Sequence, residues 1–294
     1  MSTSDFPLLL GDSIGKILRN GYESEPASHR AWVRVSDVPD FKVQSRVGLG
    51  SAPDLTAIPE LGEYTFGSLS EERETFFVTK YGKALALSWE ALVNDDLQVF
   101  GQVPRMFAQA ARRKEADVIY TDLLAANAGA GQTMFDSVAL FHADHGNLVG
   151  SAAFDATQLS LGRVKLRRQT AIGGGLLNLE PRYLIVPPEK ETAAEALISS
   201  MSRLVATTAE AAPAQWLSSL QLVVEPRVAT TAVYLVANTA QIDCAELGIL
   251  ADQGGAPFVE NESDFNTDAL FWKVRHVFGG RFIDYRGIVK LVVT

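Results

Sequence analysis

The chain has 294 residues, 47% of them hydrophobic, and its 26 Lys and Arg against 35 Asp and Glu give a formal charge of −9. This composition indicates a folded protein of roughly two domains and argues against duplex DNA as primary partner, because phosphate binding depends on clustered Lys and Arg. One cysteine, Cys244, excludes an internal disulfide framework, and no signal peptide or membrane-length apolar run is present, so we expect folding in a cytosol-like compartment without membrane contact.

The first forty residues, roughly, predict an arm rather than a domain. Asp12 or Ser13 can cap a short helix, and Pro26 and Pro39 interrupt the chain after it. Such a segment buries little by itself and needs another surface to lie on. One side of the helix would carry Ile14, Ile17, Leu18 and Tyr22.

A long hairpin is predicted next. Residues 41–50 alternate between apolar and polar side chains, which is the period of a strand, and a second extended stretch covers residues 75–88. The polar connection between them includes Pro53 and Pro59. Connections of that length usually have a function if they are ordered.

The strongest helix begins at Pro104, and we expect it to run to Ala128 because no Gly or Pro interrupts it before Gly129. A helix of that span is about 37 Å long at 1.5 Å per residue. One face is apolar and the middle is heavily charged, as in a spine-like element.

The remaining segments predict short helices and strands in irregular order, which favours a mixed α+β fold over a doubly wound sheet. Gly173 to Gly175 are expected to end the helix before them as a cap or a hinge. The predicted helices cover about residues 157–172 and 189–206, and the predicted strands cover residues 181–188, 220–225, 231–237, 272–278, 281–285 and 288–293.

The only concentrated set of chemically versatile side chains is His142, Asp144 and His145. Two imidazoles three residues apart with a carboxylate between them could hold a metal ion, given a further ligand from elsewhere. The interpretation that we favour is instead a structural loop whose side chains bond to backbone groups or to a neighbouring subunit. A helical HExxH motif and a GxSxG motif are both absent.

Five blocks of sequence, in this order, resemble the major capsid proteins of tailed phages. The blocks are DFPLLLGDSIGKIL, LGSAPDLTAIPELGEYTFGSLSEERETFFVTKYGKALALSWEALVNDDL, ALFHADHGNL, PRYLIVPPEKE and FIDYRGIV. The sequences of these blocks are similar to those of the Mu-like group, which includes fusions of a prohead protease with the major capsid protein. The order of the predicted elements also resembles the fold that tailed-phage and herpesvirus capsid proteins share.

The resemblance implies a non-enzymatic subunit without cofactor, which assembles through hexamers and pentamers into the icosahedral shell around phage double-stranded DNA. It would be made in the host cytoplasm and end in the virion. Its implied parts are an N-terminal arm (1–36), an extended loop (37–75), a peripheral domain with the spine helix (76–178 and 270–294) and an axial domain (179–269).

The implied partners are further copies of the chain, with portal, scaffold or prohead protease, and decoration proteins; DNA would touch the inner wall only non-specifically. The expected assembly contacts are Phe6, Ile14, Trp32, Pro53, Pro59, Glu71, Glu72, Arg73, Asp95 and Asp96. Three alternatives stay open: a metal-dependent enzyme centred on His142, Asp144 and His145, an encapsulin-like compartment, and a ring-forming connector.

Overall fold

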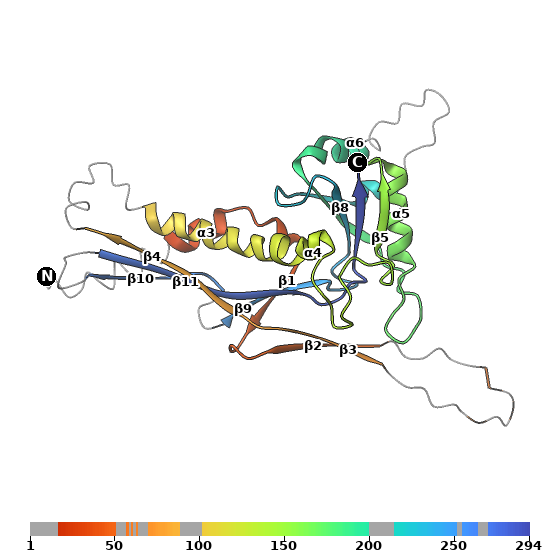
Figure 1. Cartoon of the computed structure of the whole chain (residues 1–294), viewed down its shortest axis with the longest axis horizontal. Coiled ribbons are helices and arrows are strands. Elements are labelled where there is room, and N and C mark those ends of the chain that lie inside the picture. Colours follow the sequence, from red (N-terminus) through yellow and green to blue (C-terminus); the bar gives the residue numbers. More distant parts are fainter. Residues whose placement is uncertain are drawn as a thin grey trace.

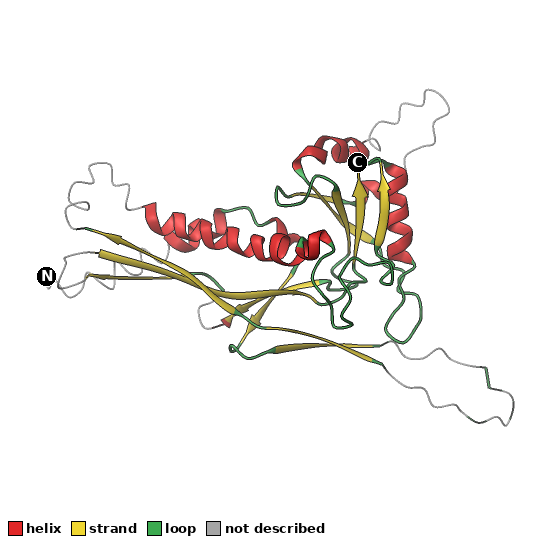
Figure 2. Cartoon of the chain, viewed as in Figure 1, coloured by secondary structure: helices red, strands yellow, loops and turns green. Residues whose placement is uncertain are grey.

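The computed structural model describes residues 17–50, 57–58, 60, 63, 70–88, 102–199, 215–251, 255–263 and 270–294. Figure 1 shows an elongated chain in which a long helix lies along one twisted sheet, a second sheet with its own helices stands at one end, and a hairpin projects from the base. Helices and strands occur in both bodies (Figure 2). The expected α+β class is therefore confirmed.

The first body is a five-stranded sheet with a helix along one face (Figure 1). Its strands follow the order β1-β9-β11-β10, and β4 also pairs with β11. The long strand β11 is antiparallel to β4, β9 and β10, so it holds this body together. The elements are β1 (Arg34–Val38), β4 (Thr79–Leu87), α3 (Val103–Asp117), β9 (Ala245–Leu250), β10 (Phe258–Ser263) and β11 (Leu270–Phe282).

The second body is a five-stranded sheet in the order β5-β12-β8-β6-β7, with α5 and α6 packed on it. The central strand β8 is buried along its whole length. The elements are β5 (Leu148–Ala152), α5 (Ala156–Arg167), β6 (Pro181–Val186), η4 (Pro188–Lys190), α6 (Glu191–Ser199), η6 (Gln215–Ser219), β7 (Gln221–Val224), β8 (Ala232–Ala237) and β12 (Ile288–Val293).

These sheets divide the chain differently from the expected domain boundaries. β5, α5 and β12 belong to the second body, although the expected peripheral ranges included them. β9 and β10 belong to the first body, although they fall inside the range 179–269. Segments of the two bodies therefore alternate along the chain. One hydrophobic core, which contains Ile119, Tyr234 and Phe278, joins the two bodies.

The N-terminal part of the described chain is attached to the first body. Residues 17–24 form a helix and residues 28–31 a 3-10 turn, η1 (Ser28–Ala31). Leu18 and Tyr22 are buried as expected, whereas Ile17 is 42% exposed. Strand β1 follows and pairs in parallel with β9, so the end of the expected arm is part of a sheet.

The spine helix is shorter than expected. α3 continues into a π-helical segment, η3 (Val118–Leu124), and the helical path ends there. Asn127 and Ala128 have φ of 51° and 56°, in the left-handed region that ends helices. The short element α4 (Ala126–Gly129) contains these two residues, so it is a turn that redirects the chain.

The predicted hairpin is present as β2 (Gln44–Leu49) and β3 (Glu71–Phe76), which pair antiparallel. The expected extended stretch of residues 75–88 is two strands, because the chain leaves the hairpin after Phe76 and enters β4 at Thr79. The predicted runs 272–278 and 281–285 are mostly one strand, β11. Gly279 lies inside it because a Cβ there would approach the Phe77 carbonyl oxygen to 2.2 Å.

Gly173, Gly174 and Gly175 form the tip of a small turn rather than a helix cap. α5 ends at Arg167, and a bridge between Thr170 and Leu176 closes the turn after it. All three glycines have positive φ, which other residues adopt only under strain. None of the helices in the described part of the chain is long and apolar enough to cross a membrane.

Candidate functional site

The β2–β3 hairpin has one face against the protein and one face in solvent. Phe76 on the inner face is buried, as is Glu74. On the outer face Val47 and Leu49 are 58% and 63% exposed, and their cross-strand partners are Arg73 and Glu71. An isolated two-stranded hairpin is marginally stable in water, so its base needs to be held by the body.

A first ion pair holds β2 to the sheet of the first body. The Arg46 guanidinium donates to both carboxylate oxygens of Glu246 on β9, at 2.5 to 2.9 Å. Ser36 on β1 donates to the same carboxylate. Burial would raise the pKa of Glu246, but the bonds from Arg46 and Ser36 outweigh it and lower that pKa. Glu246 is therefore a charged anchor for the hairpin.

Two further ion pairs hold β3. Arg281 of β11 donates to Glu74 at 3.0 Å, and the backbone N–H of Phe135 donates to the same carboxylate at 2.5 Å. Burial nevertheless dominates and raises the pKa of Glu74. Arg286 binds Glu72 through two parallel bonds of 2.8 Å each. Such two-pronged pairs fix orientation as well as distance, so the three pairs define the direction in which the hairpin projects.

Behind Arg286 lies a stack of rings. The His145 ring lies flat on the Tyr285 ring, with centroids 3.8 Å apart and an interplanar angle of 8°. The Arg286 guanidinium lies over the Tyr285 ring at 4.4 Å. Asn147 adds a bond from its amide to the Tyr285 carbonyl oxygen at 3.2 Å. Two of the sequence blocks, ALFHADHGNL and FIDYRGIV, therefore meet in space and support the base of the hairpin.

The structure supports the loop alternative for His142, Asp144 and His145. The ring nitrogens of His145 lie 3.0 Å from the Leu140 carbonyl oxygen and 2.7 Å from the Asp136 carboxylate. His142 is about half exposed and pairs locally with Asp144 at 3.2 Å. The described residues contain no group of three or more His, Cys, Asp or Glu that could hold a metal ion. The metal centre, which the sequence left open as an alternative, is therefore not brought together among the described residues.

A second polar centre attaches the N-terminal segment to α3. The carboxylate of Glu115, which has no exposed surface, receives bonds from five side chains on four elements. The His276 Nε2 atom lies at 2.7 Å and the His29 Nε2 atom at 3.3 Å. The remaining donors are Tyr22, Arg30 and Arg112.

The charge balance around Glu115 favours its ionised form. Burial by itself would raise its pKa, but the bonds from His276 and His29 and the charge of Arg30 lower the pKa well below its usual range. Burial and the neighbouring Glu115 raise the pKa of Tyr22 in turn. With two guanidinium groups beside the two imidazoles, this centre is an anion-centred anchor rather than a cation site.

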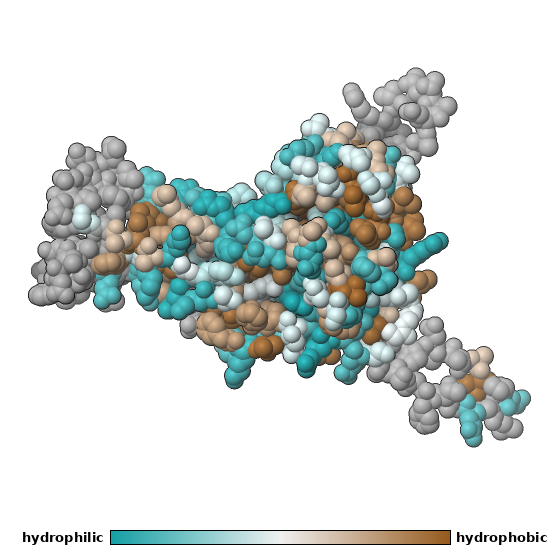
Figure 3. Space-filling view, viewed as in Figure 1, coloured by the Kyte–Doolittle hydropathy of each residue, from teal (hydrophilic) through white to brown (hydrophobic). Residues whose placement is uncertain are grey.

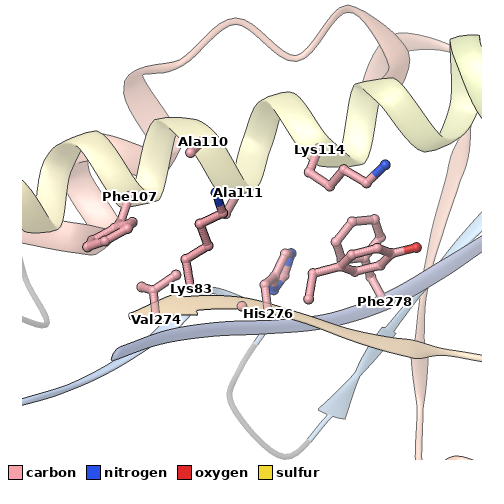
Figure 4. A pocket seen from close by; sticks show the side chains of 10 residues that line it. Lys83, Phe107, Ala110, Ala111, Lys114, Val274, His276 and Phe278 are labelled. Carbon is pink, nitrogen blue, oxygen red and sulfur yellow. The ribbon is translucent and has the colours of Figure 1, made fainter. Parts of the chain in front are cut away.

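A hollow of about 300 Å³ lies beside this centre, between α3 and the strands β4 and β11 (Figure 4). Phe107, Ala111 and Val274 make its lining mainly apolar, and Lys83 reaches across it from β4 toward α3 (Figure 4). The only histidine in the lining is His276, which Glu115 already engages. The lining residues contain no carboxylate or thiol, and their titratable side chains are Tyr81, Lys83, Lys114 and His276.

The residues expected to make assembly contacts lie in different environments. The expectation that Trp32 contacts another chain is corrected by its burial. Its side chain is 1% exposed, its indole N–H donates to the Tyr120 hydroxyl, and it has no surface left for another chain. Glu72 is used inside the chain by Arg286, whereas Glu71 and Arg73 are exposed on the outer hairpin face. The others lie outside the described residues: Phe6, Ile14, Pro53, Pro59, Asp95 and Asp96.

The anchoring residues Glu115, Glu246, Arg281 and Arg286 were not predicted from the sequence. For Glu115 a signal exists, because position 115 falls on the apolar side of the predicted helix, and a charge there needs a buried partner. For Glu246 no local signal exists, since its partner Arg46 is 200 residues away.

The family model and the solved structures that match this chain point to the same kind of protein. A family model described as phage capsid protein matches residues 71–291. No curated protein sequence matches the chain. Three solved structures illustrate the fold similarity. A chain of Microbacterium phage Oxtober96 has a TM-score of 0.61 at 10% identity, covering 92% of each chain.

The capsid of cyanophage P-SCSP1u gives a TM-score of 0.62 at 9% identity, covering 89% of this chain and 86% of that one. The SrpI encapsulin from Synechococcus elongatus PCC 7942 gives 0.58 at 10% identity, covering 91% and 87%. At these identities the likeness concerns the fold alone.

Proposed function

Because this chain belongs to the phage capsid protein family, we propose that it builds the icosahedral head of a tailed phage through hexamers and pentamers that enclose double-stranded DNA. It is a structural major capsid protein, a component of the virion that associates with copies of itself. Mu-like relatives with a fused prohead protease are the proposed subgroup, related in fold to herpesvirus capsid proteins. We assign it no enzymatic activity and propose that it assembles in the host cytoplasm.

The observation that carries the proposal is the anchored hairpin with an uncovered apolar face. Three Arg–Glu pairs fix the base of the hairpin, yet Val47 and Leu49 remain exposed among the described residues. A single chain gains nothing from orienting such a surface, whereas a shell needs projections that cover neighbouring subunits. We therefore propose that this face lies on a second copy.

The parts of the subunit follow from this assignment. Residues 1–36 would act as the arm and residues 37–75 as the extended loop. The body of α3 and β11 would be the peripheral domain, and the body of α5, α6 and β8 the axial domain. Of the sequence-expected contacts, we retain Glu71 and Arg73, together with Phe6, Ile14, Pro53, Pro59, Asp95 and Asp96. Portal, scaffold or prohead protease and decoration proteins are the proposed further partners.

The test is electron microscopy and light scattering of the purified chain beside hairpin variants. Val47→Ser with Leu49→Ser, and deletion of residues 51–68, should leave a folded subunit but abolish closed shells. Deleting residues 1–16, which precede the described part of the chain, should do the same. The matched control is Ser45→Ala, a small change on the same strand. Normal shells from all of these variants would contradict the proposal.

An encapsulin-like compartment is the second candidate, favoured by the fold likeness to the SrpI encapsulin. The two functions differ in what the shell contains. Particles isolated from the native source should hold nuclease-protected DNA if the chain forms a phage head. A defined protein cargo without DNA would favour the compartment.

A further inference from the structure

The second body carries opposite charges on its two helices. α5 packs on β5, β12 and β8, whereas α6 packs on β7 and η6. Since β5 and β7 are the two edge strands of that sheet, α5 lies toward one edge and α6 toward the other, and Arg163 of α5 reaches Trp216 of η6 between them. Figure 1 shows α5 along one side of this body and α6 at its top.

α5 is a basic helix in an acidic protein. Residues 156–168 contain four cationic side chains and no Asp or Glu, although the whole chain has a charge of −9. Two of the four are engaged within the chain: Arg167 binds Glu180 at 2.7 Å, and the Arg163 guanidinium lies over the Trp216 ring at 5.1 Å. Lys165 and Arg168 have no partner among the described residues.

The two unpartnered cations, half-buried Lys165 and exposed Arg168, lie on one side of α5. The spacing i, i+3, i+4, i+7 places Leu161, Val164, Lys165 and Arg168 on one side of the helix. Leu161 is 50% and Val164 45% exposed, although the buried side of the helix packs Leu159 and Leu166 into the core. Together with Val149 and Gly150 of the edge strand β5, the stripe lines a hollow of about 370 Å³.

The exposed apolar residues of α5 also form a patch on the molecular surface. Figure 3 shows hydrophobic side chains gathered on the surface over α5. An apolar patch rimmed by cations at the free edge of a sheet is typical of a surface that binds another protein. We call the four stripe residues Leu161, Val164, Lys165 and Arg168 the basic stripe.

The surface of α6 and of the turn η4 before it is acidic. Glu189 and Glu195 are exposed and Glu191 is half-buried, and none of them has a partner among the described residues. Glu191 and Glu195 are one turn apart, so they lie on the same side of α6. Lys190, the one cation between them, donates to the Thr294 carbonyl oxygen at 2.8 Å. We call Glu189, Glu191 and Glu195 the acidic face.

From this arrangement we propose that the basic stripe of one chain binds the acidic face of the next copy, head to tail around a ring. This contact deepens the proposed function, on which it rests, because it names the surfaces that join neighbouring subunits within one capsomer. Unlike surfaces of the same body meet, so each chain uses both surfaces and the contact repeats until the ring closes. Opposite charges fix which surface meets which and suppress pairing of like surfaces.

The occupant is a second copy rather than nucleic acid. A phosphate backbone would favour a broad run of free cations, whereas two of the four here are already engaged and the other two lie beside exposed apolar side chains. DNA at this surface is therefore an outcome that the experiment must distinguish.

A charge-swap series tests the contact in the full chain. Lys165→Glu with Arg168→Glu should cut the yield of rings and shells by at least about tenfold, because like charges then face each other. Glu191→Lys with Glu195→Lys should do the same. All four substitutions together should restore assembly. Thermal unfolding of each variant confirms that the subunit folds.

Disulfide trapping tests the same contact without reversing charge. Arg168→Cys with Glu195→Cys should give a ladder of linked chains on a non-reducing gel, up to the number of subunits in the ring, whereas each single variant should not. Cys244 contributes little background, because burial raises the pKa of its thiol to about 12.

The outcomes distinguish failure of the proposed contact from failure of the proposed function. Assembled particles that yield no ladder, together with no rescue by the four-fold variant, would overturn the contact. Shells that form normally from Lys165→Glu with Arg168→Glu but lose packaged DNA would assign the stripe to nucleic acid, and would also overturn it. A wild-type chain that forms no rings or shells under any condition would instead contradict the proposed function.

Discussion

Replacing Glu115 with Gln should detach the N-terminal segment from the spine helix. The substitution keeps the size of the side chain but removes the charge to which two guanidinium groups and two imidazoles are directed. It also introduces an amide NH₂ group among donors. Arg30 is partly exposed and can turn to water, whereas the side chain of Arg112 is only 6% exposed.

The cost is set by the charge that remains buried. Removing one partner of a buried pair costs about 3–5 kcal/mol, and the freedom of Arg30 places Glu115→Gln near the lower end. At roughly 2 °C per kcal/mol for a chain of this size, the melting temperature should fall by about 6–8 °C at pH 7. Glu71→Gln, on the exposed hairpin face, is the matched control and should stay within about 0.5 kcal/mol of the wild type.

The same variant predicts a pH dependence. Because the pKa of Glu115 is lowered in the folded chain, its stabilisation is present above the pKa of the unfolded carboxyl, about 4.3, and is lost as pH falls toward the folded pKa. The Glu115→Gln variant lacks this stabilisation at every pH. The difference between wild type and variant should therefore shrink as the pH falls below about 4.

Chemical unfolding at pH 7 and pH 3 measures this difference, and limited trypsin digestion reports on release of the segment at Arg19. A Glu115→Gln chain as stable as the wild type at pH 7 would refute the reasoning. So would a difference that stays the same at pH 3.

Three further predictions concern the hairpin base and the fold. Arg286→Gln should cost about 3 kcal/mol in urea unfolding and reduce shell yield, whereas a stability equal to wild type would show that the pair is dispensable. Gly279→Ala should lose at least about 3 kcal/mol or remain insoluble, because a Cβ there would lie 2.2 Å from a backbone oxygen, whereas Gly150→Ala has open space and should be tolerated. His145→Ala should cost about 2–3 kcal/mol by thermal unfolding and His142→Ala less than about 0.5; equal effects would contradict the stacked support.

Local patterns predicted the elements whose neighbours are close in sequence. Strict alternation in residues 44–49 predicted β2, and the helical period after Pro104 predicted α3. The ordered sequence blocks predicted the capsid family and, with it, the function. These successes share a cause, because the apolar side of each element is written into the segment itself.

The rest depends on contacts between distant parts of the chain. β9 was not predicted, because it is buried on both faces and so shows no alternation, and its Gly248 makes room for the Phe76 ring. β11 was divided at Gly279, since a glycine normally weakens a strand, whereas here it permits a close crossing. Trp32 was expected at a surface because a tryptophan in an arm shows no sign of the core that other segments supply.

Electron cryomicroscopy of the assembled protein is the most direct test of the central assignment. The account predicts closed icosahedral shells in which the outer face of the β2–β3 hairpin, with Val47 and Leu49, lies on a neighbouring chain. Particles without such shells, or shells in which that face remains in solvent, would contradict it.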